Sequence, residues 1–327
     1  MSNAALYLTE SDVTAALDMR GAILALEAML TEQGHQRAVN VPKAFNTWGD
    51  GCTMHALGSV APARGYAGFK TWLRTNKGGG SIFSLFDAER GGLLALIEAR
   101  TLGQLRTGAI TGLATQLLAP KSVRHAALIG TGPQAYTQLE AIAAVHTLDV
   151  ISVFSPTAAK RREFVEQISG RYPFEVIEAE TAAQALECAG IVTLITRAQD
   201  PFITTADLQA CKHLNAVGAI VPTKAEFSQD IFDRTDLVVV DDLENARRGS
   251  RELREHFGAD AEQWNVSTLG QLLAQGEGRP AGARMTVFKG MGMGLSDLAM
   301  AAAVYEHARK NSLGHVLPER KLPVHGH

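Results

Sequence analysis

The feature that most constrains the fold is a glycine-rich turn between an apolar segment and a helical one. Residues 126–129 form a short apolar run typical of a buried strand, and a segment rich in Ala, Gln and Leu follows the turn. Gly130 permits a tight turn, Gly132 lets a phosphate approach the backbone, and Ala135 lets helix and strand pack closely. The turn is therefore a candidate pyrophosphate site at a helix N-terminus. A lone GxGxxA pattern is weak evidence unless a βαβ unit surrounds it.

The segments that follow the turn alternate between strand-like and helix-like patterns. The second apolar run ends at Phe154, 24 residues after Gly130, which is the spacing of a dinucleotide-binding unit. This alternation predicts an α/β fold with a doubly wound parallel sheet over residues 119–295, and it supplies the context that the glycine turn requires. The predicted helices are 134–145, 158–169 and 181–188, and the further strands are 150–154, 174–177, 191–195, 213–218 and 237–241.

Residues 1–118 follow a different pattern. A helix capped by Thr9 or Ser11 is expected over 13–30, and a buried helix over 101–118. Between them, four alternating segments separated by glycine clusters predict an antiparallel sheet. A last helix, expected over 295–310, is too apolar for a free surface, so we expect it to pack on the N-terminal region. Residues 1–118 and 296–327 thus predict one α+β domain. Its four expected strands are 52–57, 66–73, 81–87 and 93–97.

The overall composition excludes several classes of function. A net charge of −3 argues against a nucleic-acid-binding surface. The three cysteines are far apart and form no CxxC pair, which predicts buried thiols in a reducing compartment and no metal site. No signal peptide precedes the first helix, and no apolar run reaches the ~18 residues of a membrane span. We therefore expect a cytoplasmic protein that does not enter membranes.

The end of the second strand of the nucleotide unit bears on the choice of coenzyme. An acidic residue there would bind the ribose diol of NAD, but the sequence reads Phe154-Ser-Pro-Thr157. The hydroxyls of Ser155 and Thr157 suit a 2′-phosphate and slightly favour NADP over NAD, as do the nearby cations Lys160, Arg161 and Arg162. The alternative is that these cations form only a solvated helix face.

Two cations in the N-terminal half lie among apolar neighbours. Lys70 is within a strand rich in apolar and aromatic residues, and Arg106 is on a helix of small, apolar residues. Together they offer a point charge and a planar fork for a carboxylate. A mid-strand lysine is usually solvent-facing, and Arg106 is equally suited to a structural ion pair, so both alternatives remain open.

Four segments together resemble the ornithine cyclodeaminase/mu-crystallin family, and the resemblance covers almost the whole chain. It implies a homodimer of subunits that each pair a Rossmann domain with a dimerisation and substrate domain, acting on small α-amino or α-imino acids. The four segments are Arg106-Thr-Gly-Ala-Ile-Thr-Gly-Leu-Ala114, Gly130-Thr-Gly-Pro-Gln-Ala135, Asn215-Ala-Val-Gly218 followed by Pro222 and Glu226, and Gly292 to Asp297.

The resemblance also assigns residues to roles. It implies that Lys70 and Arg106 bind the substrate carboxylate and act in catalysis, whereas Lys43 stands where the family has an arginine and cannot make its bidentate fork. Lys289 is expected at the nicotinamide end or on a substrate oxygen, with a structural role as the alternative. Arg74 suggests a second carboxylate, as in iminosuccinate, unless it belongs to an exposed basic loop. The implied NAD(P)-binding residues are Thr107, Gly130, Thr131, Gly132, Pro133, Gln134, Ala135, Ser155, Thr157, Arg161, Thr196, Val217 and Gly218.

One departure decides between activities within the family. Cyclodeaminases carry an Asp shortly after the Asn-Ala-Val-Gly strand, and Ile220 stands there in this chain. Because isoleucine neither pairs with an amine nor transfers a proton, we expect the dehydrogenase and imine reductase branch. Hydride would add to the Cα of an imine, and Lys70 would relay a proton if desolvation lowers its pKa. The alternatives are a cyclodeaminase-type lyase and a non-enzymatic NADP- and ligand-binding protein of the mu-crystallin kind.

Overall fold

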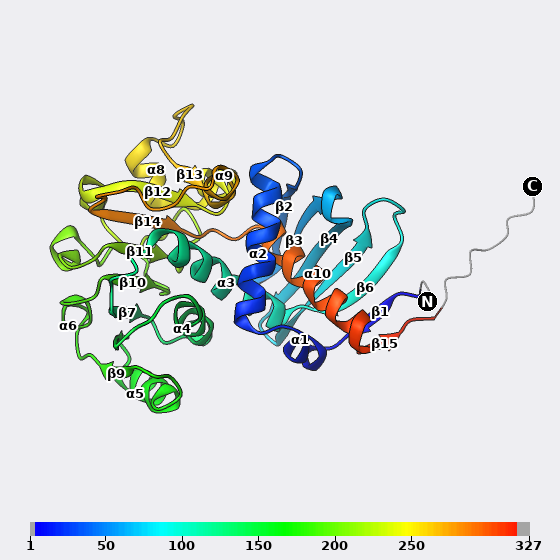
Figure 1. Ribbon diagram of the computed structural model, residues 1–327, viewed down its shortest axis with the longest axis horizontal. Helices are drawn as coiled ribbons and strands as arrows, with labels where there is room; N and C mark the ends of the chain where they lie inside the picture. Colours follow the sequence, from blue (N-terminus) through cyan, green and yellow to red (C-terminus); the bar gives the residue numbers. More distant parts are fainter. Residues whose placement is uncertain (1–3, 319–327) are drawn as a thin grey trace, which may run out of the picture.

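The computed structural model describes residues 4–318, and within them two sheets lie side by side with helices between and around them (Figure 1). Residues 1–3 and 319–327, including the end of the predicted C-terminal part of the first domain, lie outside the described residues. In Figure 1 the sheet built mainly from the middle of the chain lies on the left, and the N-terminal sheet lies on the right. No helix among the described residues is long and apolar enough to cross a membrane.

The left-hand sheet has eight strands, all parallel, in the order β13-β12-β14-β11-β10-β7-β8-β9. The strand order reverses between β7 and β10, so ligands are expected at the C-terminal edge beside β7. The doubly wound parallel sheet predicted from the sequence is confirmed. The strands are β7 (His125–Ile129), β8 (Val150–Phe154), β9 (Glu175–Glu178), β10 (Ile191–Leu194), β11 (His213–Ala216), β12 (Thr235–Val240), β13 (Ser267–Thr268) and β14 (Met285–Lys289).

The sequence analysis missed one central strand of this sheet. β14 lies between β11 and β12, and all five of its residues are buried. Its apolar run is short and ends in a lysine, so it carries no periodic signal. Helices surround the sheet: α4 (Pro133–Val145), α5 (Ala158–Ile168), α6 (Ala182–Leu186), α7 (Leu243–Gly249), α8 (Arg251–Phe257) and α9 (Leu269–Gln275), with the 3₁₀ turns η2 (Thr205–Leu208) and η3 (Gln229–Arg234).

The second sheet has seven strands in the order β15-β1-β6-β5-β4-β3-β2; β3 to β6 are the four predicted antiparallel strands, and β2 extends them by one antiparallel strand. β2 was not predicted as a strand because it contains Pro42. The strand tolerates this proline at the sheet edge, where its register with β3 shifts between Val41 and Ala44. The strands are β1 (Leu6–Leu8), β2 (Val39–Trp48), β3 (Cys52–Ala61), β4 (Tyr66–Thr75), β5 (Gly78–Asp87), β6 (Leu93–Glu98) and β15 (His315–Val316), with the turn η1 (Pro62–Arg64).

The helices of the N-terminal half differ from the prediction in one respect. The helix expected over 13–30 is two helices, α1 (Glu10–Ala16) and α2 (Met19–Gly34). Thr9 caps α1 through a capping box with Asp12, and Asp18 starts α2 by accepting from the backbone of Gly21. An Asp within a periodic pattern can therefore be a new N-cap rather than part of one helix.

Two long helices join the sheets. α3 (Arg100–Leu118) packs on α2 and α10 and also on α4 and β11 of the parallel sheet. α10 (Gly294–Asn311) packs on β2 to β5, as Figure 1 shows, so the last helix returns to the N-terminal sheet as expected. The start of α10 and the middle of α3 consequently meet between the two sheets.

Candidate functional site

A cluster of opposite charges occupies the meeting point of β4, α3 and α10. Lys70 Nζ lies 2.6 Å from Asp297 Oδ1, and Arg106 Nε lies 3.5 Å from the same oxygen. Lys70 is 5% exposed and Asp297 is fully buried. Lys70 reaches α10 because its side chain points to the α10 face of β4, while its strand neighbours point to the other face. The structure thus brings together the two cations that the sequence singled out.

Asp297 is a member of the cluster to which the sequence analysis gave no role. Its Oδ2 atom and Arg106 Nε are buried without a hydrogen-bond partner among residues 4–318. Buried polar atoms are nearly always paired in folded proteins, so an unpaired donor and acceptor side by side mark a place for a polar ligand. The sequence signals were an acidic residue near the start of an otherwise apolar helix and its place at the end of the family-like segment Gly292 to Asp297.

The charges of the cluster shift the pKa of its lysines. Burial lowers the pKa of Lys70 below its usual value; Asp297 opposes this shift, and the charges of Arg106 and Lys43 add to it. Burial and the Arg106 charge likewise lower the pKa of Lys43. Lys70 and Arg106 thus share one carboxylate, and the charge of Lys43 acts on the same lysine, so the positive charges here outnumber the Asp297 carboxylate and suit an anionic ligand.

Aromatic rings line the same face of the sheet. Lys70 Nζ lies 5.1 Å and Lys43 Nζ 5.5 Å from the centroid of the Trp72 ring, distances at which cations are attracted to an aromatic face. The His55 ring stacks on Trp72 with centroids 4.5 Å apart. Burial and the Lys43 charge lower the pKa of His55, which favours its neutral form. His55 was not singled out from the sequence, although its place two residues before Leu57, the partner of Lys70, puts it on this face.

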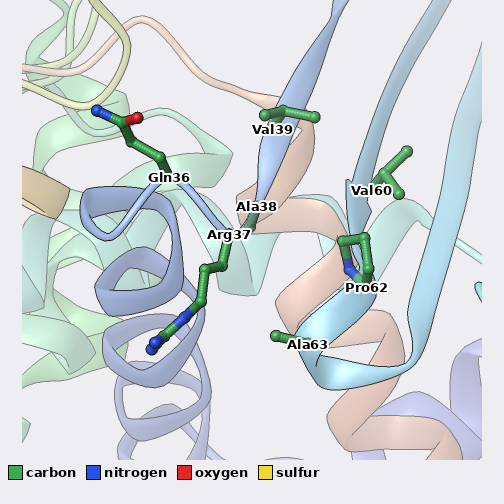
Figure 2. Close-up of a pocket in the computed structure, with 7 residues that line it drawn as sticks. All are labelled: Gln36, Arg37, Ala38, Val39, Val60, Pro62 and Ala63. Carbon is green, nitrogen blue, oxygen red and sulfur yellow. The ribbon is translucent and has the colours of Figure 1, made fainter.

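Arg74 does not join the cluster. It shares the face of Lys70 and Trp72 but follows Lys70 by four residues, or ~13 Å along β4, and its side chain is exposed. One pocket lies elsewhere (Figure 2). It has a volume of about 390 Å³ and contains none of the predicted site residues. Its lining residues come from the turn after α2, the facing ends of β2 and β3, and η1: Gln36, Arg37, Ala38, Val39, Val60, Pro62 and Ala63.

The glycine turn fits a dinucleotide. Gly130 has φ +115°, and a Cβ there would lie 2.4 Å from the carbonyl oxygen of Ile195. At Gly132, the N-cap of α4, a Cβ would meet nothing within 4 Å, so the backbone faces open space in front of the helix N-terminus. Thr107 lies beside this helix, because its carbonyl accepts from Gln138 of α4. Among residues 4–318 no group of His, Cys, Asp and Glu is arranged to hold a metal ion.

Arg161 is placed differently from the expectation. Its Nη1 donates to the Ser155 carbonyl at 2.7 Å, and its Nε pairs with Glu178 Oε1 at 2.9 Å. The guanidinium is buried and already neutralised, so it is not the free cation that a 2′-phosphate would need. Thr157, Lys160 and Arg162 remain exposed at the same corner of the sheet.

The position of Lys289 fits the structural alternative. It is fully buried and pairs with the equally buried Glu252 at 3.0 Å. A lysine enclosed with its carboxylate in this way is suited to a structural role and not to a contact with a substrate oxygen. Nearby in the same sheet, Thr196 lies in the loop after β10, and Val217 and Gly218 lie in the loop after β11. The carboxylate of Glu226 connects the two loops by accepting hydrogen bonds from the backbone of Thr196 and of Gly218. Ile220 follows these loops with 48% of its side chain exposed.

The two halves of the site meet at one glycine. Gly292, with φ +83°, lies in the turn after β14, at the C-terminal edge of the parallel sheet. A Cβ on it would lie 2.8 Å from Arg106 Nη1. The charge cluster therefore adjoins the edge where a doubly wound sheet binds its ligand.

Comparisons with known proteins agree with this architecture. The family model described as "Ornithine cyclodeaminase/mu-crystallin family" matches residues 6–312. The chain is 29% identical to the alanine dehydrogenase of Archaeoglobus fulgidus, over 94% of this chain and 97% of that one. It is 30% identical to a Δ(1)-pyrroline-2-carboxylate reductase of Bacillus cereus, over 71% and 72% of the two chains.

A solved structure supports the same assignment. An archaeal alanine dehydrogenase dimer with bound NAD is 26% identical, with a TM-score of 0.87 over 96% of this chain and 99% of that one. The resemblance seen in the sequence is confirmed, since both the family model and the structural likeness extend over nearly all of the chain. The chain belongs to the ornithine cyclodeaminase/mu-crystallin family.

Proposed function

We propose that this protein is an NAD(P)-dependent oxidoreductase that reduces a small α-imino acid to an α-amino acid, or catalyses the reverse dehydrogenation. The observation that carries the proposal is the shared contact of Lys70 and Arg106 with Asp297, beside the edge of the parallel sheet. An alanine dehydrogenase and an imino-acid reductase among its relatives support the same class of reaction.

The residues of the cluster divide the work as follows. Arg106 and Lys70 bind the substrate carboxylate, which orients the imine carbon towards the parallel sheet. When bound, the reduced coenzyme supplies the hydride that this carbon accepts. Lys70 gives a proton to the imine nitrogen, so that one hydride and one proton convert C=N to CH–NH. Asp297 holds Lys70 in place and favours its protonated form.

The substrate side chain is expected to lack a distal amine. Ile220 offers no charge to such a group, which disfavours cyclisation of ornithine or lysine. A second carboxylate held by Arg74 has no support, because Arg74 is exposed and forms none of the contacts that join Lys70, Arg106 and Asp297. A small monocarboxylic imino acid, linear or cyclic, fits best.

Coenzyme choice rests on the corner after β8. With Arg161 paired to Glu178, the 2′-phosphate of NADP would depend on Thr157, Lys160 and Arg162. We therefore expect both coenzymes to be accepted, with a small preference for NADP. The ratio of kcat/KM for NADPH and NADH measures this preference, and a ratio far below one contradicts it.

The same proposal includes a homodimer. Four large apolar side chains of β2, β3 and β4 are 40–50% exposed. Two of them, Phe69 and Leu73, lie on the face of β4 that points away from Lys70 and α10. A second copy covering this face would bury them, and the archaeal relative is described as a dimer. Light scattering should therefore give twice the chain mass. The four residues are Trp48, Met54, Phe69 and Leu73.

One screen tests the activity. α-Keto acids with ammonia or methylamine, and cyclic imino acids, are mixed with the protein while the absorbance of NADH and NADPH is followed separately. Loss of absorbance with at least one imino acid is expected. Ammonia release from ornithine without net change in coenzyme would instead identify a lyase. Tight coenzyme binding without turnover of any of these compounds would identify a binding protein.

A further inference from the structure

We infer that Glu226 is a positioning residue for hydride transfer, because its carboxylate fixes the two loops on which the nicotinamide end of the coenzyme would rest. The link to hydride transfer rests on the proposed function. The way in which Glu226 holds two neighbouring loops of the parallel sheet is observed independently of that function.

One carboxylate bridges the ends of two adjacent strands. Oε1 of Glu226 accepts from the backbone N–H and the hydroxyl of Thr196, both at 2.8 Å, in the loop after β10. Oε2 accepts from the N–H of Gly218 at 2.9 Å and of Ala219 at 3.2 Å, after β11. Glu226 is fully buried. The C-terminal ends of β10 and β11 stand next to β7 and its glycine turn, so the bridge lies at the ligand-binding edge of the sheet.

The bridge explains why residue 218 is glycine. A Cβ there would lie 2.3 Å from Glu226 Oε1 and 2.4 Å from the backbone nitrogen and oxygen of Thr196. The φ of Gly218 is not in the left-handed region, so close approach of the two loops, and not backbone conformation, excludes a side chain. The loops are thus packed to contact around the carboxylate.

A second buried layer holds Glu226 itself. Its backbone N–H donates to Oε1 of Glu252 at 3.1 Å, and the same oxygen pairs with Lys289 at 3.0 Å. The other oxygen of Glu252 accepts from the Ser250 hydroxyl. Lys289 ends β14, the strand next to β11. The Lys289–Glu252 pair therefore anchors the segment that carries Glu226 to the central strands of the sheet.

Replacing one carboxylate oxygen of Glu226 by a nitrogen should break hydrogen bonds that hold the two loops together. All four of its donors are N–H or O–H groups, so both oxygens of Glu226 must accept. Glu226→Gln keeps the shape but turns one oxygen into an NH₂ group that donates, which leaves at least one buried N–H facing another donor. An unsatisfied buried donor costs enough to displace a loop. The loops after β10 and β11 are therefore expected to separate or loosen in this variant.

The first test needs no coenzyme or substrate. Hydrogen exchange of the loops around Thr196 and Gly218 is compared in the wild type, in Glu226→Gln and in Glu98→Gln. The last is a matched control, because Glu98 accepts from Tyr7 and from the backbone of Glu10 in the other sheet. Exchange of both loops is expected to be faster by at least tenfold in Glu226→Gln only. Unchanged exchange, or an equal rise in the control, overturns the inference.

The second test measures how the bridge affects binding and reaction of the coenzyme. The Kd for NADH, by fluorescence titration, is expected to rise about 5- to 100-fold in Glu226→Gln and to stay within twofold in Glu98→Gln. The isotope effect with NADH deuterated at C4 should also change, while KM for the imino acid changes less than Kd for NADH. A Kd for NADH within twofold of the wild type overturns the inference.

If Glu226→Gln does not fold, a milder variant tests the same inference. Thr196→Val keeps the size of the side chain and removes one of the four donors, and it should shift exchange and NADH affinity in the same direction by a smaller factor. Hydrogen exchange and NADH affinity do not require turnover. They therefore remain informative even if no imino acid proves to be a substrate, and failure of the proposed function is distinguished from failure of this inference.

Discussion

Two buried charge networks, one at the C-terminal edge of the parallel sheet and one between β4, α3 and α10, differ in how completely they are paired. In the network around Glu226, both oxygens of Glu226 and both of Glu252 accept hydrogen bonds, and Lys289 is enclosed with its partner. In the network around Asp297, one carboxylate oxygen and Arg106 Nε lack hydrogen-bond partners among the described residues. A fully satisfied network specifies a scaffold, whereas an incomplete one leaves polar groups for a ligand.

Two buried lysines show the difference between the two networks most clearly. Lys70 and Lys289 are both almost completely buried, and each pairs with a buried carboxylate. Within residues 4–318, Lys289 shares Glu252 with no other cation, so its charge is balanced. Lys70 shares Asp297 with Arg106, and Lys43 lies close enough to affect its pKa. The first lysine should therefore act on stability and the second on turnover.

Replacing Lys70 is expected to have the largest effect. Lys70→Met should lower kcat by about 10²- to 10⁴-fold, because proton transfer by a positioned side chain contributes that much. NADH affinity should stay within twofold, since Lys70 is on β4 and not at the glycine turn of the parallel sheet. Steady-state kinetics and fluorescence titration measure the two quantities. The double variant Lys70→Met/Asp297→Asn removes the unpaired carboxylate as a cause, and near-normal kcat in either variant contradicts the role of Lys70.

The sequence predicted much of this arrangement but could not distinguish the two lysines. The glycine turn, the alternation after it and the strand of Lys70 follow from local periodicity, which near neighbours in the chain determine. The carboxylates that pair with the two lysines do not follow from local periodicity, because Asp297 lies 227 residues from Lys70 and Glu252 lies 37 residues from Lys289. Which carboxylate faces which cation depends on tertiary packing, and that is why the sequence left two roles open for Lys289 and gave Asp297 none.

Breaking the paired network should mainly affect stability. Lys289→Met leaves Glu252 buried and unpaired, and it should reduce the free energy of unfolding by about 3–5 kcal/mol. Lys289→Met/Glu252→Leu should recover part of that loss. Denaturant unfolding gives both values. KM for the imino acid should remain within threefold in the folded variants, and a rise of tenfold or more would return Lys289 to the substrate site.

Removing the planar fork should mainly affect substrate affinity. Arg106→Ala should raise KM for the imino acid about 10- to 150-fold, because a hydrogen bond to a charged group contributes about 1.5–3 kcal/mol. Kd for NADH should change little. Arg106→Lys tests whether charge alone suffices, and it should recover only part of the loss because lysine lacks the fork. An equal loss of NADH affinity would show that Arg106 acts on the coenzyme instead.

The smallest effects concern pH. If protonated Lys70 is required for reduction, kcat/KM should fall as the pH rises through the pKa of Lys70, which burial places below its usual value. Asp297 raises this pKa, so Asp297→Asn should move the alkaline limb of the profile to lower pH. Lys43 lowers it, so Lys43→Met should move the limb to higher pH. Shifts of the same sign in both variants would contradict the role of Lys70 as proton donor.

The central claim is that the incompletely paired network binds the carboxylate of an imino acid. The most direct measurement compares kcat/KM for the best imino acid of the screen with kcat/KM for the same imine lacking its carboxylate, in the wild type and in Arg106→Ala. The wild type should prefer the carboxylate-bearing imine strongly, and this preference should fall at least tenfold in the variant. An unchanged preference in Arg106→Ala would contradict the claim.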